Sequence, residues 1–467
     1  MTADKIKFGT DGWRAIIAQD FTVYNVARVS QALADWLLAS NKEAKVVVGH
    51  DCRFGGELFT EMVTKVLCAN GIKVYLAKGF ISTPMISLGV LKMNAQQGVV
   101  ITASHNPPSY NGYKLKGAHG GPSSPKDIAA VEALIKDEVK IPAENLAHWE
   151  EKGLLEYVNL EDMYIEYLKT KFNFDELNNS PFKLAYDAMY GAGQNVVRRL
   201  LPGAVLLHCE NNPGFNGQAP EPLDRNLQEL SKTIRNTPEL KIGLATDGDA
   251  DRIGLYDEDG NFVDAHHIIL LLVHYLHKYK GMTGKVAIAF SATDRVKRMA
   301  EKYGLPVEVT PIGFKYISEI MINEDVLVGG EESGGIAVKG HIPERDGIYD
   351  GLVIYEFMTQ TGKTLKQLCE EVYEVVGTFV YDRNDLHIAN DKKEAIIKKA
   401  LDKGYTEFGK YTFNTIETID GVKYHLDNGG WIMLRASGTE PLLRVYAEGN
   451  SKEQTADILE DVLATIL

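Results

Sequence analysis

Short apolar runs alternate with amphipathic stretches along this chain, and this alternation limits the folds that it can adopt. Near the N-terminus, the runs with the composition of buried strands are residues 46–48, 74–76 and 99–102. Apolar side chains recur at helical spacing over residues 26–37, with Thr22 as the expected N-cap. Further helices are expected over about residues 57–69 and from Ser124 onwards, where Pro125 follows the cap. Strands that alternate with helices predict α/β layers.

The alternation recurs along the chain and predicts several domains. Further strands are expected at residues 183–187, 242–246, 285–290 and 326–328. From about residue 376, charged helical sequence alternates with short strands. A chain of 467 residues also exceeds what one hydrophobic core usually serves. We therefore expect three related α/β domains and a smaller α+β domain, at residues 1–155, 156–260, 261–375 and 376–467.

Composition excludes some classes of function. The net charge of −14 argues against a broad nucleic-acid surface. The four cysteines form no CxxC pair, which argues against a zinc site and fits a reducing compartment. The longest aliphatic stretch, residues 268–273, is too short to span a bilayer, and residues 1–11 contain no apolar signal core. These features predict a cytoplasmic protein that binds neither nucleic acid nor membrane, and they leave its oligomeric state open.

The first loop that carries chemistry is Thr102-Ala103-Ser104-His105-Asn106-Pro107-Pro108, directly after an apolar strand. A serine at a strand end beside a histidine can be an activated nucleophile. An Asn-Pro turn with a capping serine explains the same residues equally well. The GxSxG elbow of serine hydrolases is absent, which argues against that class.

The second loop places three carboxylates at alternate positions, Asp247, Asp249 and Asp251, after an expected strand. Oxygen ligands in this arrangement can converge on one hard cation. A calcium EF-hand is the alternative, because Glu258 stands at its twelfth position. Arg252, however, occupies the sixth position, where that loop needs glycine, and the flanking residues have strand rather than helix composition. The pattern favours a magnesium site, and a plain solvated acidic turn is a further alternative.

The third loop, residues 329–335, is rich in glycine and carries Glu331 and Ser333. Glycines let the backbone approach a ligand closely, and a carboxylate with a hydroxyl suits sugar hydroxyls. A glycine-rich hairpin with exposed carboxylates would have the same sequence.

The fourth loop, residues 435–441, joins Arg435 to two hydroxyl residues, and Arg444 follows it. Two arginines, two hydroxyls and a flexible glycine make a good phosphate cradle. A surface turn whose arginines pair with nearby glutamates remains an alternative.

In this order the loops resemble those of the α-D-phosphohexomutase superfamily: phosphoglucomutases, phosphomannomutases and phosphoglucosamine mutases. The resemblance covers essentially the whole chain, beginning at the segment Phe8-Gly9-Thr10-Asp11-Gly12-Trp13-Arg14. It implies three similar α/β domains and a C-terminal α+β domain around a central cleft. It also implies a magnesium-dependent isomerase that interconverts hexose 1- and 6-phosphates through phosphorylated Ser104 and a hexose 1,6-bisphosphate. A phosphosugar-binding protein without turnover and a phosphate-releasing hydrolase are the alternatives of other classes.

The resemblance also assigns residues to roles. The catalytic residues would be Ser104, His105, Lys114, Arg14 and Arg252. The metal ligands would be Ser104, Asp247, Asp249 and Asp251. The substrate contacts would be Glu331, Ser333, Lys315, His341, Arg345, Arg435, Ser437, Gly438, Thr439 and Arg444. Lys114 or His105 would remove a sugar hydroxyl proton, which for Lys114 predicts a pKa lowered by neighbouring cations.

The sugar is predicted from the third loop. Its sequence Glu331-Glu332-Ser333-Gly334 resembles the GEES-type loop of glucose-type mutases. Dual mannose/glucose enzymes more often carry methionine at the position of Glu332, and glucosamine mutases more often carry glutamine. Gly335 departs from the pattern, since many bacterial members have histidine there. We expect glucose phosphates to be preferred and mannose phosphates to be usable, with phosphoglucosamine mutase or phosphomannomutase as the alternatives.

Overall fold

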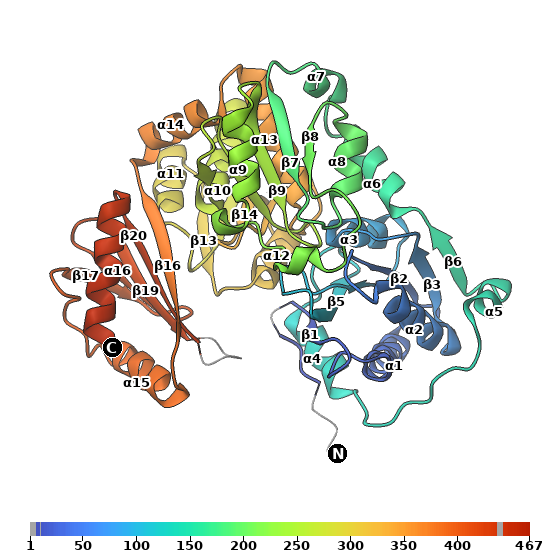
Figure 1. Cartoon of the computed structure of the whole chain (residues 1–467). Helices are drawn as coiled ribbons and strands as arrows, with labels where there is room; N and C mark the ends of the chain where they lie inside the picture. Colours follow the sequence, from blue (N-terminus) through green and yellow to red (C-terminus); the bar gives the residue numbers. More distant parts are fainter. Residues whose placement is uncertain (1–5, 10, 437–441) are drawn as a thin grey trace. The chain divides into compact units, whose positions relative to one another are not determined.

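The computed structural model of this chain describes residues 6–9, 11–436 and 442–467, and it divides into two compact units. The first unit comprises the chain up to residue 287 together with residues 313–369. The second comprises residues 288–312 and 370–467 (Figure 1). Two elements carry the chain from one unit into the other: β12 (Lys285–Ala289) and α14 (Leu365–Val376).

The N-terminal part of the first unit is built on a six-stranded mixed sheet. Its strands are β1 (Trp13–Ile16), β2 (Lys45–His50), β3 (Lys73–Ala77), β4 (Gln97–Ile101), β5 (Tyr110–Gly117) and β6 (Leu155–Val158). Its helices are α1 (Val23–Ser40), α2 (Gly56–Ala69), α3 (Thr83–Lys92), α4 (Pro125–Ala133) and α5 (Leu146–Glu151). The strand order is β1-β5-β4-β2-β3-β6 (Figure 1). The last four strands of this order run parallel, whereas β5 is antiparallel to both of its neighbours, β4 and β1.

Local sequence determines where these helices begin and end. The Thr22 hydroxyl accepts a hydrogen bond from the amide of Asn25, and Ser124 caps α4 in the same way. Helix α2 ends at Asn70-Gly71, where Gly71 has a φ of +81°. The three helix ends expected from the sequence are therefore confirmed.

A second, five-stranded sheet follows in the first unit. Its strands are β7 (Lys183–Asp187), β8 (Val205–Leu207), β9 (Leu240–Thr246), β10 (Ile253–Tyr256) and β11 (Phe262–Val263). Its helices are α6 (Leu160–Lys169), α7 (Phe174–Asn178), α8 (Gln194–Leu200) and α9 (Gln228–Asn236). In the order β11-β10-β9-β7-β8, strands β9, β7 and β8 are parallel. Strand β10 turns back antiparallel to β9, so residues 247–252 form a tight connection between them.

The remaining elements of the first unit complete its third group of strands and helices. They are α10 (Ala265–His274), α12 (Phe314–Asn323), β14 (Val326–Gly330), β15 (Ile336–Val338) and α13 (Gly347–Thr361). Strands β14 and β15 pair antiparallel, and Phe314 and Ile317 of α12 pack against Val326 and Ala337 on these strands. Residues 331–335, between β14 and β15, are thereby held on a buried hairpin.

The second unit contains a five-stranded antiparallel sheet. The helices and strands of this unit are α11 (Arg295–Tyr303), β13 (Val307–Thr310), β16 (Val380–His387), α15 (Asn390–Leu401), β17 (Phe413–Glu417), β18 (Val422–Leu426), β19 (Trp431–Ala436), β20 (Leu442–Gly449) and α16 (Lys452–Ile466). The sheet has the order β16-β20-β19-β18-β17. Helices α15 and α16 share a core with it, to which Ile396, Ile458 and Val462 contribute. This sheet and its two helices have the α+β arrangement expected for the C-terminal part of the chain.

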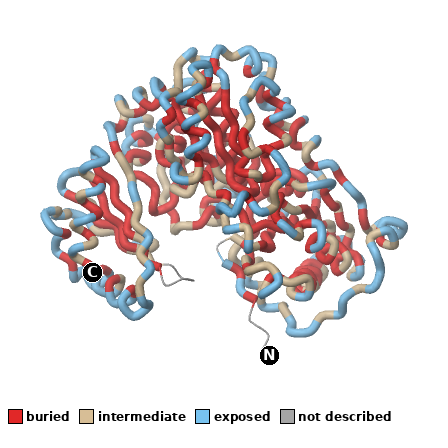
Figure 2. The backbone as a smooth tube through the Cα atoms, in the orientation of Figure 1, coloured by how far each residue is buried: buried red, intermediate tan, exposed pale blue. Residues whose placement is uncertain are grey.

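Strands of both units are among the most buried parts of the chain (Figure 2). All five residues of β4 are buried, as are all five of β14. Continuous burial is typical of strands covered on both faces. None of the helices that the structure describes combines the length and apolarity needed to cross a membrane. The domain boundaries expected after residues 155, 260 and 375 stay predictions.

Candidate active site

Ser104 lies beyond the end of β4 and close to the acidic loop. Its side chain is buried, and its backbone has a φ of +52°, in the left-handed region that non-glycine residues rarely adopt. The Ser104 hydroxyl donates a hydrogen bond to Asp247 Oδ2 at 2.7 Å and lies 3.2 Å from His105 Nδ1. Strained backbone at such a position is common at functional sites. The structure thus brings together two of the loops in which the sequence predicts chemistry.

Asp247, Asp249 and Asp251 follow the end of β9 and converge. All three are fully buried, and one carboxylate oxygen from each lies within 4.8 Å of the others. Asp249 Oδ1 and Asp251 Oδ1 accept no hydrogen bond from any residue that the structure describes. Burial, and then the charges of Asp249 and Asp251, raise the pKa of Asp247 well above its ordinary value. Converging buried carboxylate oxygens without donors fit a hard divalent cation such as Mg²⁺.

This geometry excludes the EF-hand alternative. The loop connects two antiparallel strands, β9 and β10, and not two helices. Ala250 at its centre has a φ of +56°, which supplies the sharp turn in place of the glycine of a calcium loop. The loop is therefore a strand-to-strand turn that points its carboxylates to one place.

Lys114 of β5 lies buried among these carboxylates. Its ammonium nitrogen lies 2.7 Å from Asp249 Oδ2, 3.0 Å from Asp251 Oδ2 and 3.0 Å from Asp11 Oδ2. Burial lowers the pKa of Lys114, but the three carboxylates outweigh this and raise the pKa well above its ordinary value. The predicted lowering was wrong, because the nearest neighbours of this lysine are anions. Lys114 is therefore charged in this arrangement.

Basic side chains also flank the loop that carries Ser104. Arg14 Nη1 donates to the side-chain oxygen of Asn106 at 2.7 Å, two residues beyond the serine. Arg252 lies 3.5 Å from His105 Nε2 and forms an ion pair with Glu221 at 3.2 Å. Burial, and then the positive charges headed by Arg252, lower the pKa of His105 well below its ordinary value. His105 is accordingly neutral and can accept a proton at the nitrogen that faces Ser104.

The predicted sugar contacts Glu331 and Ser333 lie between β14 and β15. Glu331 Oε1 accepts a hydrogen bond from the Gly313 amide at 2.9 Å. Burial raises the pKa of Glu331 to about 7, with Arg345 acting in the opposite direction. Ser333 is partly exposed in the turn that follows. Lys315 is also partly exposed, and its ammonium lies 5.4 Å from the ring centroid of Tyr316.

His341 and Arg345 lie in the same loop but in different surroundings. Arg345 Nη2 forms ion pairs with Asp251, at 2.7 Å, and with Asp11, which brings Arg345 into the acidic site. The His341 side chain is 1% exposed, and its Nε2 lies 2.9 Å from Asp346 Oδ2. It also stacks on Tyr349, with ring centroids 3.9 Å apart. The structure thus places Arg345 at the site, whereas His341 packs inside the protein.

The predicted phosphate cradle lies in the second unit. Arg435 of β19 and Arg444 of β20 are directly paired across the two strands. Arg435 Nε lies 3.1 Å from Asp420 Oδ1, and Arg444 Nε lies 3.9 Å from Asp385 Oδ1. Like charges directly opposite each other on a sheet are unfavourable unless anions accompany them. The remaining predicted contacts, Ser437, Gly438 and Thr439, lie outside the described residues.

Several residues of the site were not found from the sequence. Thr83, at the start of α3, donates its hydroxyl to Asp249 Oδ2 at 2.6 Å, and its amide donates to the Asp249 carbonyl. Asp11 pairs with Lys114 and Arg345. Glu221 pairs with Arg252. Ser82-Thr83-Pro84 signals only a helix start, and no local pattern marks the other two contacts.

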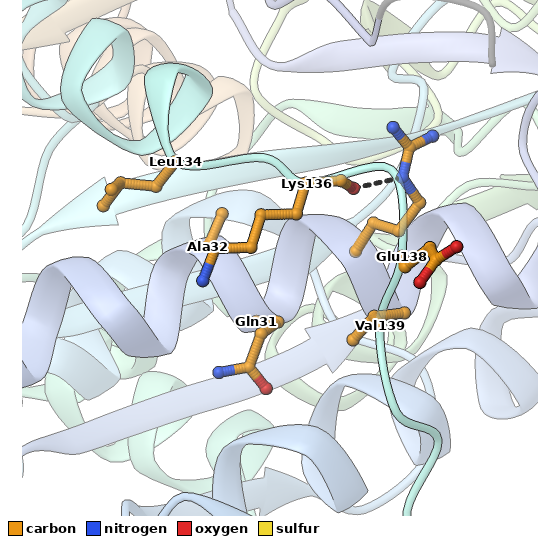
Figure 3. A pocket seen from close by; sticks show the side chains of 7 residues that line it. Gln31, Ala32, Leu134, Lys136, Glu138 and Val139 are labelled. Carbon is orange, nitrogen blue, oxygen red and sulfur yellow. Dashed lines mark hydrogen bonds between the residues drawn. The ribbon is translucent and has the colours of Figure 1, made fainter. Parts of the chain in front are cut away.

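A small surface hollow lies away from these residues (Figure 3). It is lined by Arg28, Gln31, Ala32, Leu134, Lys136, Glu138 and Val139. None of the predicted catalytic, metal-binding or substrate-binding residues lines it. Arg28 Nε donates to the Lys136 carbonyl at 2.6 Å, so this polar group of the hollow is already satisfied.

Comparison with known proteins places this site in one family. Four models of phosphoglucomutase/phosphomannomutase domains match in chain order. The alpha/beta/alpha domains I, II and III match residues 5–141, 162–260 and 264–376, and the C-terminal domain matches residues 386–465. The expected architecture of three α/β domains and a C-terminal domain is thereby confirmed.

Individual proteins are similar over nearly their full length. A probable phosphoglucosamine mutase of Methanosphaera stadtmanae is 31% identical, covering 97% of this chain and 96% of the relative. A phosphoglucomutase/phosphomannomutase of Thermococcus kodakarensis is 29% identical with the same coverage. The solved structure of a putative phosphomannomutase from Thermus thermophilus is 34% identical, has a TM-score of 0.87, and the match covers 99% of each chain.

Proposed function

Because the chain belongs to the phosphoglucomutase/phosphomannomutase family, we propose that it interconverts hexose 1-phosphates and hexose 6-phosphates through a phosphorylated Ser104. The main observation in support of this proposal is that Ser104 lies beside the three converging buried aspartates. Its Oγ is 2.7 Å from Asp247 Oδ2. Lys114 and Arg345 meet the same carboxylates. Phosphoryl transfer depends on in-line placement and charge neutralisation more than on covalent help from the protein, and these charged groups could supply the neutralisation.

The proposed reaction has two phosphoryl transfers. A free C6 or C1 hydroxyl oxygen attacks the phosphorus on Ser104, so that a sugar O–P bond forms and the Ser104 Oγ–P bond breaks. The proton lost by the sugar hydroxyl is matched by the proton that Ser104 Oγ gains. The hexose 1,6-bisphosphate then turns over, and its other phosphoryl returns to Ser104 by the reverse chemistry. The position of the phosphate on the sugar changes, and the enzyme is regenerated.

The side chains around Ser104 have distinct tasks in this proposal. His105 is neutral, and its Nδ1 lies 3.2 Å from Ser104 Oγ, so it can hold the proton that passes between the sugar and the serine. Lys114 is charged, and with Arg14 and Arg252 it stabilises the negative charge of the transferring group. In this proposal Lys114 therefore contributes as a cation.

Asp247, Asp249 and Asp251 would hold Mg²⁺ together with an oxygen of the Ser104 phosphoryl group. The two buried carboxylate oxygens without hydrogen-bond donors among the described residues support this assignment. When bound, the ion would supply charge neutralisation for the phosphoryl group. Thr83 and Lys114 hold Asp249, which keeps its carboxylate oriented toward the shared position.

We infer that glucose phosphates are the preferred substrates, on the resemblance of Glu331-Glu332-Ser333-Gly334 to the loop of glucose-type mutases. The departure at Gly335 has a physical reason. A Cβ atom there would lie 2.4 Å from Cδ of Arg345, so a larger residue would require the arginine that pairs with Asp251 to move. Phosphoglucosamine mutase is the second candidate, favoured by the relative of that name at 31% identity.

The sugar preference is tested by comparing kcat/KM for the 1-phosphates of glucose, mannose and glucosamine, with hexose 1,6-bisphosphate and Mg²⁺ present. We expect glucose 1-phosphate to be best and mannose 1-phosphate to follow within several-fold, because one hydroxyl orientation changes hydrogen bonding by only about 1 kcal/mol. A roughly tenfold preference for glucosamine or mannose 1-phosphate would assign the loop to another subgroup.

The second-unit arginines are proposed to grip the phosphate that is not reacting. Arg435→Ala should lower kcat/KM roughly ten- to hundred-fold in both reaction directions, because a charge-assisted bidentate contact contributes a few kcal/mol. Arg199→Ala is a suitable control, since Arg199 is a half-exposed arginine paired with Glu161 and Asp162. Unchanged kinetics in both Arg435→Ala and Arg444→Ala would make this loop an ordinary turn.

A further inference from the structure

Arg53 follows β2 and lies beneath the loop that carries Ser104. Its side chain is completely buried. One terminal nitrogen, Nη1, donates to the carbonyls of Pro107 and Tyr110, at 2.9 and 3.2 Å. The other, Nη2, donates to the carbonyls of Ser104 and Asn106. One guanidinium group therefore donates hydrogen bonds to four backbone carbonyls of the short segment 104–110.

Asp51 and Thr102 complete this arrangement from the other side. Asp51 Oδ2 lies 3.3 Å from Arg53 Nε and accepts the hydroxyl hydrogen bond of Thr102. The Thr102 hydroxyl oxygen in turn accepts a hydrogen bond from the Ser104 amide at 2.9 Å. Both the amide and the carbonyl of Ser104 are thus fixed by a network that begins at Arg53.

Arg53 also lies next to the acidic loop. A Cβ atom at Gly248 would come within 2.5 Å of the Ser104 carbonyl and 3.6 Å of Arg53 Nη2. On another side, the ring centroid of Phe215 lies 4.9 Å from the Arg53 guanidinium carbon. The guanidinium therefore lies at the junction where residues 104–110 and residues 247–251 meet.

The physical demand for this residue comes from the backbone of Ser104. A non-glycine residue at a φ of +52° keeps that conformation only where its surroundings hold it. A planar guanidinium presents five donors in a fixed fork, whereas a lysine ammonium is a compact group with three. Only arginine can serve all four carbonyls in this geometry.

We propose that Arg53 is a positioning residue for phosphoryl transfer. By fixing the carbonyls of residues 104–110, it keeps Ser104 Oγ directed at Asp247 and beside His105. Its hydrogen bonds go to backbone carbonyls, its ion pair to Asp51 and its ring contact to Phe215, so these directional contacts act on the reaction through the serine loop. Its charge also lies near Asp247 and Asp249, and Arg53→Lys retains that charge. This inference rests on the proposed function, because it assigns Arg53 to the step in which Ser104 receives and donates the phosphoryl group.

The test is the variant Arg53→Lys, which retains the charge and loses the fork. The measured quantity is the rate of phosphoryl transfer from the phosphorylated protein to glucose 1-phosphate in a single turnover, beside the steady-state KM. A displacement of the serine by about 1 Å costs roughly a hundred-fold in rate, so we expect a loss of that size. KM should stay within about threefold of the wild-type value, because no substrate contact has been removed.

Arg28→Lys is the matched control. Arg28 is likewise buried and also donates to a backbone carbonyl, that of Lys136, but it belongs to α1 and lines the hollow of Figure 3. This variant should lower the melting temperature without changing the transfer rate. A wild-type transfer rate in Arg53→Lys would overturn the inference. If the wild-type protein itself showed no transfer, the proposed function would be wrong, and the inference that rests on it would also fail.

If Arg53→Lys does not fold, Asp51→Asn tests the same network. It removes the charge that faces Arg53 Nε and weakens the acceptor of the Thr102 hydroxyl, with almost no change of size. We expect a roughly tenfold lower transfer rate, which corresponds to one charge-assisted hydrogen bond. An unchanged rate in Asp51→Asn would overturn the inference.

Discussion

Ser104→Ala is expected to lose more than about 10⁴-fold in mutase turnover, because alanine has no oxygen to carry the phosphoryl group. The fold should persist, since the serine hydroxyl contacts Asp247 and His105 while the loop is held through its backbone. Ser30→Ala is the matched control. Ser30 is a buried serine of α1 that donates to the Val26 carbonyl, and its removal should leave turnover unchanged.

Intact mass measured after incubation with hexose 1,6-bisphosphate shows directly whether Ser104 carries the phosphoryl group. The wild-type protein and Ser30→Ala should each gain the mass of one phosphoryl group, and Ser104→Ala should gain none. Full turnover in Ser104→Ala would contradict the mechanism. So would an active wild-type protein that never carries the added mass.

Removal of divalent metal should abolish turnover, and Mg²⁺ should restore it. The three aspartates offer only hard oxygen ligands, which suit Mg²⁺ better than softer metals. Asp249→Asn should weaken Mg²⁺ binding, measured by calorimetry, by roughly a hundred-fold, because one charged ligand is lost at a buried site. The calorimetric measurement is independent of activity and reports on the site itself.

Asp257→Asn is the control for this experiment. Asp257 is also buried and lies just after β10, but it accepts hydrogen bonds from Asp259 and Asn261 and does not belong to the converging cluster. Its replacement should leave Mg²⁺ affinity unchanged. Turnover that is indifferent to chelator would contradict the assignment, and a strict calcium requirement would point to a different kind of site.

The fold could be predicted in large part because its signals are local. Apolar runs mark the buried strands, and caps such as Thr22 and Ser124 mark where helices begin. Candidate site loops could also be proposed from the sequence, because each combines chemically distinctive residues in a short segment. Their combination and their order along the chain carried the resemblance to a family.

The contacts between loops could not be predicted, because they join residues far apart in the chain. Lys114 meets Asp249 across 135 positions, and this pairing reverses the direction of its predicted pKa shift. Arg53 stands in a segment with no catalytic pattern, and its task depends on carbonyls 51 to 57 positions away. The pKa and the role of a lysine or arginine depend on the residues that surround it in the fold, and a single sequence does not show which residues those are.

We propose that this chain moves a phosphoryl group within a hexose phosphate through Ser104. The most direct measurement is ³¹P NMR of the wild-type protein with glucose 1-phosphate, Mg²⁺ and a trace of glucose 1,6-bisphosphate. We expect the signal of the 6-phosphate to grow as that of the 1-phosphate declines, with no inorganic phosphate formed. Growth of inorganic phosphate without the 6-phosphate, or an unchanged spectrum with all three sugar 1-phosphates, would contradict it.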